Sequence, residues 1–308
     1  MKRPYSREIV ESLHFGDSMF RTLKGVEPVR NADGTLRLTS GRYAIVFEVL
    51  WRGGRYALKC YTQPRPHLSK VCTVLGAHPC SHIIRPTYLP EELWAGERYV
   101  DVAIYPWQEG HNLDWHIRHA LHNRDTEALR RLREEFCRLA LDILQSPWRH
   151  GDMKSENIIV RRDGEMVLVD CDALFCPGLE WSGEMGTPPY IHPARGSAYD
   201  SHIDDYAIAL LLTSLAALER APHLATGEVL VALPSQNKRG ELSRLMGDTP
   251  PLLELLESLY STDYKTNNLN ELTLRFLLFR NFTVSFHKSC KIYCRCVRKA
   301  CYNKHKIA

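Results

Sequence analysis

Residues 150–172 constrain the fold more than any other part of the chain. Two short apolar runs, residues 158–160 and 166–169, lie on either side of an Arg-Asp-Gly turn at 162–164. This pattern predicts a β-hairpin, because a short glycine-containing connection turns one strand back on the other. The residues before the first strand and those after the second should therefore lie close together.

The open end of this hairpin carries polar residues on both sides. They are Asp152, Lys154, Asn157, Asp170 and Asp172. Carboxylate and amide oxygens are the ligands that magnesium prefers. A lysine supplies positive charge for a phosphate group, and a free carboxylate can orient a hydroxyl. The pattern predicts a site for a metal ion and a phosphate group.

These residues resemble the protein kinase family, in which His-Arg-Asp-x-Lys-x-x-Asn is followed, after a hairpin, by Asp-Phe-Gly. The resemblance implies that Asp152 accepts or orients the substrate hydroxyl and that Lys154 stabilises the transferred phosphoryl group. It also implies that Asn157 and Asp170 hold magnesium. Asp172 is predicted as an additional metal ligand.

The chain departs from the family pattern at several positions. Gly151 replaces the arginine that commonly pairs with a phosphorylated loop residue, so control by phosphorylation of the following loop is not expected. Cys171 and Asp172 replace Phe-Gly. Residues 186–193 resemble the end of a kinase activation segment, but Ala194 stands where that segment has glutamate.

A second hairpin is predicted upstream, where residues 44–51 and 55–61 flank Gly53-Gly54. Its second run contains Tyr-Ala-Leu-Lys at residues 56–59, which is similar to the Val-Ala-Ile-Lys of kinases. The resemblance therefore extends to a segment far from the first hairpin in the sequence.

The resemblance implies that this second hairpin binds ATP. Lys59 would reach the α- and β-phosphates, and Val46 and Ala57 would form the apolar roof over the adenine. The family's glycine-rich loop before the first strand has three glycines. Only Gly41 is present at the corresponding positions here.

The family's lysine forms an ion pair with a glutamate on the following helix. No Asp or Glu lies between Lys59 and Glu91, so the expected helix at about residues 66–75 cannot supply one. Either the region is built differently or Lys59 has another partner. The remaining candidates are Asp170, Asp172, Glu8 and Glu11.

Residues 99–105 predict a strand that leads into a hinge. The resemblance makes Tyr105 the residue at the back of the nucleotide pocket, and Pro106 and Gln108 the hinge residues whose backbone pairs with adenine. Proline is compatible with the first hinge position, since it lacks only the N–H donor. For Trp107, a role in the hinge and a role in ordinary packing are equally consistent with the sequence.

The second half of the chain predicts helices. Apolar residues recur at spacings of three and four in residues 113–122 and 126–145. Residues 204–210 resemble the start of the central kinase helix, and the apolar run at 207–218 predicts a helix that is buried nearly all round. Asp204 is predicted to cap or tether the catalytic-loop backbone.

Charge is distributed unevenly. Residues 1–271 hold 31 basic and 36 acidic residues, a net charge of −5, whereas the following residues hold nine basic and no acidic ones. The basic end predicts a solvated tail in preference to nucleic-acid or anionic-membrane binding. Its cysteines and histidines lack the usual zinc spacing, so a poorly packed tail is also favoured over a metal site. They are His287, Cys290, Cys294, Cys296, Cys301 and His305.

These observations predict an α+β, two-lobed protein kinase-like fold, with a small, mainly antiparallel β N-lobe and a larger, mainly α-helical C-lobe. The predicted divisions are an N-terminal flank at 1–36, the N-lobe at 37–106, the C-lobe at 107–280 and a basic, cysteine-rich tail at 281–308. We expect no signal peptide, no membrane span and no disulfide framework, and hence a reducing, cytoplasmic location.

The predicted function is ATP- and magnesium-dependent transfer of a phosphoryl group to Ser or Thr of a protein, most similar to bacterial Hanks-type kinases. Their Ser-Gly-x-Tyr-Ala-x-Val-Phe opening resembles residues 40–47, and their Asp-x-Asp motif resembles residues 170–172. A nucleotide-binding pseudokinase is one alternative. The other, a small-molecule kinase of the aminoglycoside or choline type, is disfavoured by Lys154 and residues 186–193.

Overall fold

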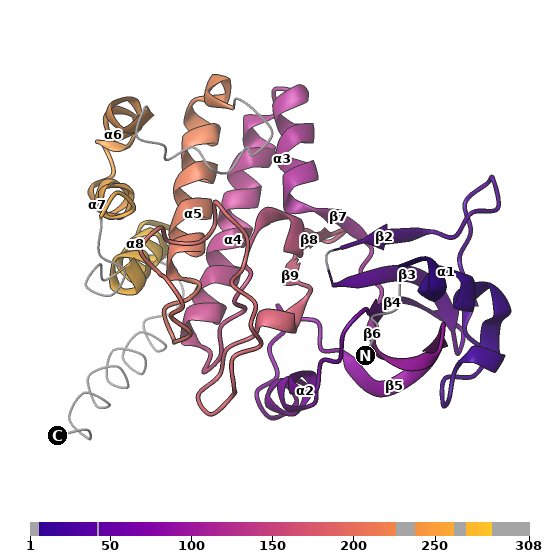
Figure 1. Ribbon diagram of the computed structural model, residues 1–308. Coiled ribbons are helices and arrows are strands. Elements are labelled where there is room, and N and C mark those ends of the chain that lie inside the picture. The colour runs from indigo at the N-terminus through magenta and orange to yellow at the C-terminus, as the bar shows by residue number, and fades with distance from the viewer. Residues whose placement is uncertain (1–5, 42, 226–237, 262–268, 285–308) are drawn as a thin grey trace.

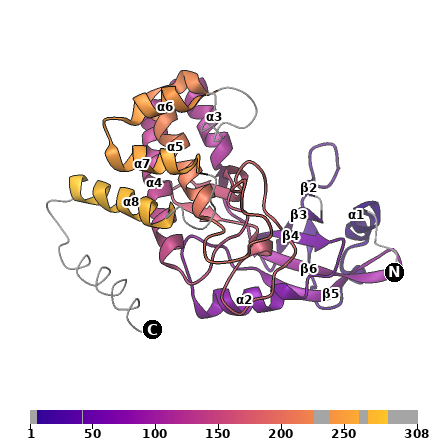
Figure 2. The same cartoon turned by 60° about the vertical axis from the view of Figure 1, so that its left-hand side comes forward.

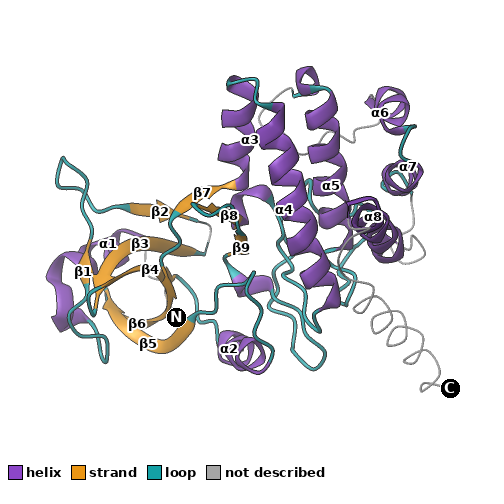
Figure 3. Ribbon diagram, turned by 180° about the vertical axis from the view of Figure 1, so that it is seen from behind, coloured by secondary structure: helices purple, strands orange, loops and turns teal. Residues whose placement is uncertain are grey.

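The computed structural model describes residues 6–41, 43–225, 238–261 and 269–284. The protein is α+β. Strands gather in the N-terminal part and helices in the C-terminal part, as Figure 1 and the view from behind in Figure 3 show. Within the described residues, no helix is long and apolar enough to cross a membrane.

The N-terminal part is built on a six-stranded antiparallel sheet in the order β1-β3-β4-β6-β5, with β2 paired to β3. The strands are β1 (Glu27–Pro28), β2 (Leu38–Ser40), β3 (Ala44–Trp51), β4 (Gly54–Tyr61), β5 (Thr87–Ala95) and β6 (Arg98–Pro106). The predicted hairpin over Gly53-Gly54 is confirmed as β3 and β4. The predicted strand at 99–105 is confirmed as β6.

Alternation along β4 gives this sheet two different faces. Leu58 and Cys60 point into a core that includes Ile9 and Leu13 of helix α1 (Ser6–Phe15), so the N-terminal flank packs on the sheet as expected. Lys59 lies between those two residues and points to the other face. That second face is the one turned toward the rest of the chain.

A second, three-stranded antiparallel sheet has the order β7-β8-β9, formed by β7 (Gly110–Asn112), β8 (Ile158–Arg161) and β9 (Met166–Leu168). The β8–β9 pair confirms the hairpin predicted at 158–169. Helix α2 (His67–Ala77) lies alongside β5 in Figure 2. The Ile84 amide donates to the carbonyl of Leu168 (3.0 Å), which joins the segment after α2 to β9.

The helices of the C-terminal part begin where the sequence supplies caps. Asn112 accepts from the Trp115 amide at the start of α3 (Leu113–His122), and Asp125 accepts from the Ala128 amide at the start of α4 (Thr126–Gln145). Both helices have the bounds that the periodicity predicts. The others described are α5 (Asp205–Arg220), α6 (Arg239–Met246), α7 (Pro250–Ser258) and α8 (Leu269–Val284).

Helix α5 is buried from Ala207 to Leu218, as its largely apolar sequence predicts. It contacts α4, α7 and α8 and forms the centre of the helical part. Helix α8 runs four residues into the predicted tail. The remainder of the tail, with its cysteines and histidines, lies outside the described residues.

Candidate functional site

The loop before β8 is held by the start of α5. The two carboxylate oxygens of Asp204 accept from the backbone amides of His150 (2.5 Å) and Gly151 (2.8 Å), and Asp204 is fully buried. The ring of His150 also contacts the carbonyl of Val169 (2.9 Å). The tethering role predicted for Asp204 is confirmed.

Gly151 has a structural reason for its lack of a side chain. Its φ is +84°, in the left-handed region that favours glycine. A Cβ at this position would clash with the backbone carbonyl of Ala173. The loop therefore packs directly against the backbone that follows β9, at the position where kinases carry an arginine.

Asp152 has one carboxylate oxygen bound and one free. Oδ2 accepts from Nδ2 of Asn157 (3.1 Å) and lies 3.0 Å from Nζ of Lys154. Oδ1 is buried and has no hydrogen-bond partner among the described residues. Gly186 lies beside it, since a Cβ there would be 3.6 Å from Oδ1. Lys154 also donates to the Thr187 hydroxyl (2.9 Å).

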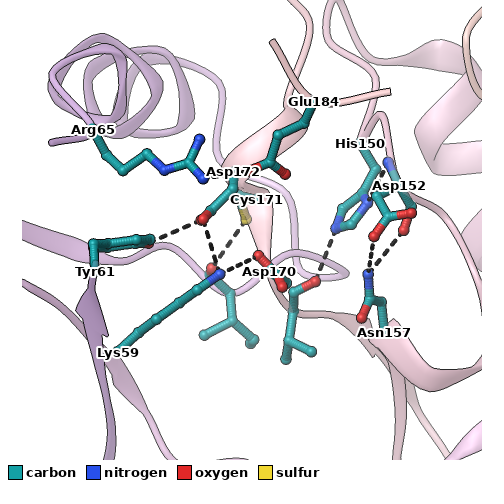
Figure 4. Close-up of polar contacts among 12 residues, drawn as sticks. Lys59, Tyr61, Arg65, His150, Asp152, Asn157, Asp170, Cys171, Asp172 and Glu184 are labelled. Carbon is teal, nitrogen blue, oxygen red and sulfur yellow. Dashed lines mark hydrogen bonds and ion pairs between the residues drawn. The ribbon is translucent and has the colours of Figure 1, made fainter. Parts of the chain in front are cut away.

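Lys59 meets the two carboxylates that follow β9, at the same open end of the hairpin. Its Nζ donates to Oδ1 of Asp170 (2.6 Å) and to Oδ2 of Asp172 (2.9 Å), as Figure 4 shows. Two of the four candidate partners are thus in contact with it. The other two, Glu8 and Glu11, lie on α1, which covers the opposite face of the sheet.

The two carboxylates differ in exposure. The side chain of Asp170 is 42% exposed, whereas that of Asp172 is 4% exposed. Asp172 is further held by the Tyr61 hydroxyl, which donates to its Oδ1 (2.9 Å), and by the ring of His67, which lies 3.0 Å from its backbone oxygen. Both oxygens of Asp172 are occupied.

Burial and charge act against each other on the pKa values of this cluster. Burial by itself lowers the pKa of Lys59, but the charges of Asp170 and Asp172 outweigh it and the pKa rises above the ordinary 10.5. Burial raises the pKa of Asp170, but the charge of Lys59 outweighs it and the pKa falls below 3.8. Burial dominates for Asp172, whose pKa is raised despite Lys59.

The site offers few protein ligands for a metal ion, which suits magnesium bound together with phosphates and water. Among the described residues, no group of three or more His, Cys, Asp or Glu could hold a metal ion. Asp170 is the accessible carboxylate, and Asn157 uses its Nδ2 on Asp152, which leaves its Oδ1 available. Magnesium commonly binds to one or two protein ligands together with substrate phosphates and water. Asn157 and Asp170 fit that pattern.

The predicted adenine contacts lie on the face of the sheet that carries Lys59. Val46 is the cross-strand partner of Lys59, and Ala57 is the cross-strand partner of Tyr105. Gly41 follows β2, and its amide donates to the carbonyl of Ala44 (2.9 Å) at the start of β3.

The predicted hinge residues are bonded to one another. Nε2 of Gln108 donates to the carbonyl of Pro106 (2.8 Å), and Arg161 donates to the side-chain oxygen of Gln108. A carbonyl oxygen has two lone pairs, so that of Pro106 can still accept a second hydrogen bond. The guanidinium of Arg55 lies over the Trp107 ring, 4.7 Å from the ring centroid.

A buried ion pair lies beside this cluster and was not predicted. Arg65, just before α2, contacts Glu184 (3.0 Å), and their side chains are 8% and 20% exposed. Burial and the charges of Asp172 and Asp170 raise the pKa of Glu184 to about 7, against the lowering effect of Arg65. No local pattern identifies such a pair. Tyr61, by contrast, could have been found, since it lies two residues after Lys59 on one strand.

A surface cavity of about 310 Å³ lies elsewhere, between α3, α4 and the β8–β9 turn. His116, His119 and Arg131 are among its lining residues. None of the residues that the sequence predicts for the site lines it.

No protein-family model matches the chain, and no curated protein matches it. The chemistry of the site is therefore inferred from its geometry. That geometry places a buried lysine, an exposed carboxylate, an asparagine and a second, half-free carboxylate around the open end of one hairpin.

Proposed function

We propose that the protein is a kinase that transfers the γ-phosphoryl group of ATP, with magnesium, to Ser or Thr of a protein. Its strand-rich part, residues 37–106, would serve as the N-lobe and residues 107–280 as the C-lobe. The observation that carries the proposal is the 2.6 Å ion pair between Lys59 and Asp170. It joins a phosphate-binding lysine on one sheet to a metal-binding carboxylate beside the other.

Four residues of the site have separate roles in the proposed reaction. Asp152 has a carboxylate oxygen that no described residue bonds, and this oxygen can accept the proton of a substrate hydroxyl. Lys154 lies 3.0 Å from that carboxylate and carries the charge that a transferred phosphoryl group needs. Magnesium, when bound, would neutralise the phosphate charges. Asn157 and Asp170 are the residues that would hold it.

Lys59 can bind a phosphate group and keep its hydrogen bonds to the two aspartates. An ammonium group has three N–H donors, and two of them bond to Asp170 and Asp172. The third remains for a phosphate oxygen. The apolar residues Val46 and Ala57 on the same face supply the surface against which an adenine ring can pack.

A second candidate is a nucleotide-binding switch that transfers no phosphate. One observation favours it. The free oxygen of Asp152 is fully buried beside Gly186. In this candidate the site binds nucleotide, but the substrate hydroxyl never reaches the carboxylate.

The decisive experiment measures label transfer from γ-labelled ATP to a generic protein substrate, with magnesium, for wild type and Asp152→Asn. We expect the variant to lose about 10²- to 10⁴-fold in rate, because it cannot accept the proton. Its affinity for ATP should stay near that of wild type. Equal rates in the two proteins would contradict the role of Asp152. ATP binding without transfer in wild type would support the switch instead.

A further inference from the structure

Lys59 needs a permanent counter-ion that α2 does not supply. Its side chain is only 10% exposed, and a buried ammonium without a partner is strongly unfavourable. Helix α2 contains no Asp or Glu. The position of Lys59 must therefore depend on carboxylates from the segment after β9.

Asp172 is fixed far more firmly than Asp170. Its side chain is 4% exposed, and its two oxygens accept from Lys59 (2.9 Å) and from the Tyr61 hydroxyl (2.9 Å). Its backbone oxygen contacts the ring of His67, the first residue of α2 (3.0 Å). Asp172 thus joins β4, α2 and the segment after β9 at one point.

Asp170 is placed to exchange partners. It is 42% exposed, and the bond of Lys59 to its Oδ1 is the only side-chain hydrogen bond described for its carboxylate. Replacing that bond with a bond to a metal ion exposes no buried charge, because solvent already reaches the group. The same exchange at Asp172 would break two buried hydrogen bonds, one from Lys59 and one from the Tyr61 hydroxyl.

We propose that Asp172 is a positioning residue that holds Lys59 for the nucleotide phosphates, and that of these two aspartates only Asp170 binds metal. Asp172 then takes the place of the helix glutamate, and Tyr61 keeps its carboxylate in place. This proposal rests on the proposed function. It also replaces the sequence-based assignment of Asp172 as a metal ligand.

The test separates phosphate binding from metal binding in the full-length protein. Calorimetry in EDTA would compare ADP with adenosine, for wild type, Asp172→Asn and Asp170→Asn. We expect Asp172→Asn to lower the affinity for ADP about tenfold or more, with adenosine unchanged, because only the phosphates contact Lys59. Asp170→Asn should leave the affinity for ADP in EDTA within about twofold of wild type.

Magnesium dependence supplies the second readout. Asp170→Asn should raise the magnesium concentration for half-maximal transfer about tenfold. Asp172→Asn should leave that concentration unchanged and raise the KM for ATP. If Asp172→Asn shifts the magnesium requirement as Asp170→Asn does, Asp172 is a metal ligand and the proposal is wrong. Unchanged affinity for ADP in Asp172→Asn would also overturn it.

Tyr61→Phe is the conservative variant, because it removes one hydrogen bond to Asp172 and keeps the ring. It should lower the affinity for ADP in the same direction by a smaller factor, about two- to fivefold. No effect on ADP would contradict the role of Tyr61 in fixing Asp172.

Failure of the proposed function would be visible separately. Wild type would then transfer no phosphate although it binds ADP, which leaves the calorimetric comparison valid, or it would bind neither ADP nor adenosine. If neither ligand binds, double-mutant cycles on the unfolding equilibrium show whether Lys59 interacts more strongly with Asp172 or with Asp170. Lys59→Met should couple to Asp172→Asn about tenfold in the unfolding equilibrium constant, and less to Asp170→Asn. Stronger coupling to Asp170 would overturn the proposal.

Discussion

Two glycines, Gly151 and Gly186, lie where backbone segments approach each other closely beside Asp152. Gly151 has no side chain at a place where none fits, because the backbone of Ala173 lies there. Gly186 is similar, since a Cβ there would approach the Gly151 carbonyl to 2.9 Å. The two glycines let three backbone segments meet beside Asp152.

Gly151→Ala should therefore destabilise the protein by about 2 to 4 kcal/mol, from left-handed backbone strain together with a backbone clash. Gly164→Ala in the β8–β9 turn is the matched control, with φ +91° and no atom within 4 Å of a Cβ. It should cost about 1 kcal/mol, from strain alone. Urea unfolding measures both. Equal losses would show that the contact with Ala173 is unimportant.

At the scale of elements, segments far apart in sequence are joined by buried polar contacts. Helix α5 is joined to the loop before β8 by Asp204. The start of α2 is joined to the segment after β9 by Arg65 and Glu184. Lys59 and Asp172 join β4 to that same segment. Each contact fixes an element that carries a predicted site residue.

The burial of Glu184 beside Asp172 and Asp170 predicts a pH dependence of stability in metal-free buffer. The folded-state pKa of Glu184 is raised from its ordinary 4.5 to about 7, so the folded protein holds this proton more tightly than the unfolded chain. Its contribution is fully present below about pH 4.5 and is lost as the pH rises through 7. This amounts to about 2 to 3 kcal/mol between pH 5 and pH 8.

The variant Glu184→Gln removes the titrating group and keeps its shape. Its unfolding free energy should change less between pH 5 and pH 8 than that of wild type. Urea unfolding at the two pH values checks this. Parallel changes in both proteins would mean that other groups, such as Lys59, Asp170 and Asp172 beside it, dominate the dependence.

At the scale of the whole molecule, one apolar core runs from the second face of the N-terminal sheet into the helical part. It includes Tyr61 and Tyr105 from the sheet, Leu68 from α2 and the buried residues of α5. The other face of the sheet has a separate core completed by α1. The N-terminal flank is thus part of the folded structure, and the lysine-bearing sheet depends on it.

Leu13→Ala tests this dependence. Leu13 is 1% exposed between α1 and the sheet, so truncation should cost about 2 to 4 kcal/mol through lost burial and a cavity. Phe15→Ala, two residues along and 69% exposed, should cost less than about 0.5 kcal/mol. Thermal unfolding compares the two. Similar losses would show that α1 does not support the sheet.

Local patterns determined the elements of this protein. Turn residues and alternation specified the two hairpins, and capping residues with periodicity specified α3 and α4, because these preferences act over a few neighbouring residues. The hairpin itself followed from its turn, so Asp152 and Asn157, which are in contact, precede its first strand and Asp170 follows its second.

Only the tertiary structure decided which side chains meet. The partners of Lys59, the clash that excludes a side chain at Gly151 and the Arg65–Glu184 pair all join segments far apart in the chain. So does the contact of Arg161 that holds Gln108 against Pro106. Such contacts follow from how the sheets and α2 pack, and packing depends on shape across the whole core. A local sequence pattern therefore does not specify these contacts.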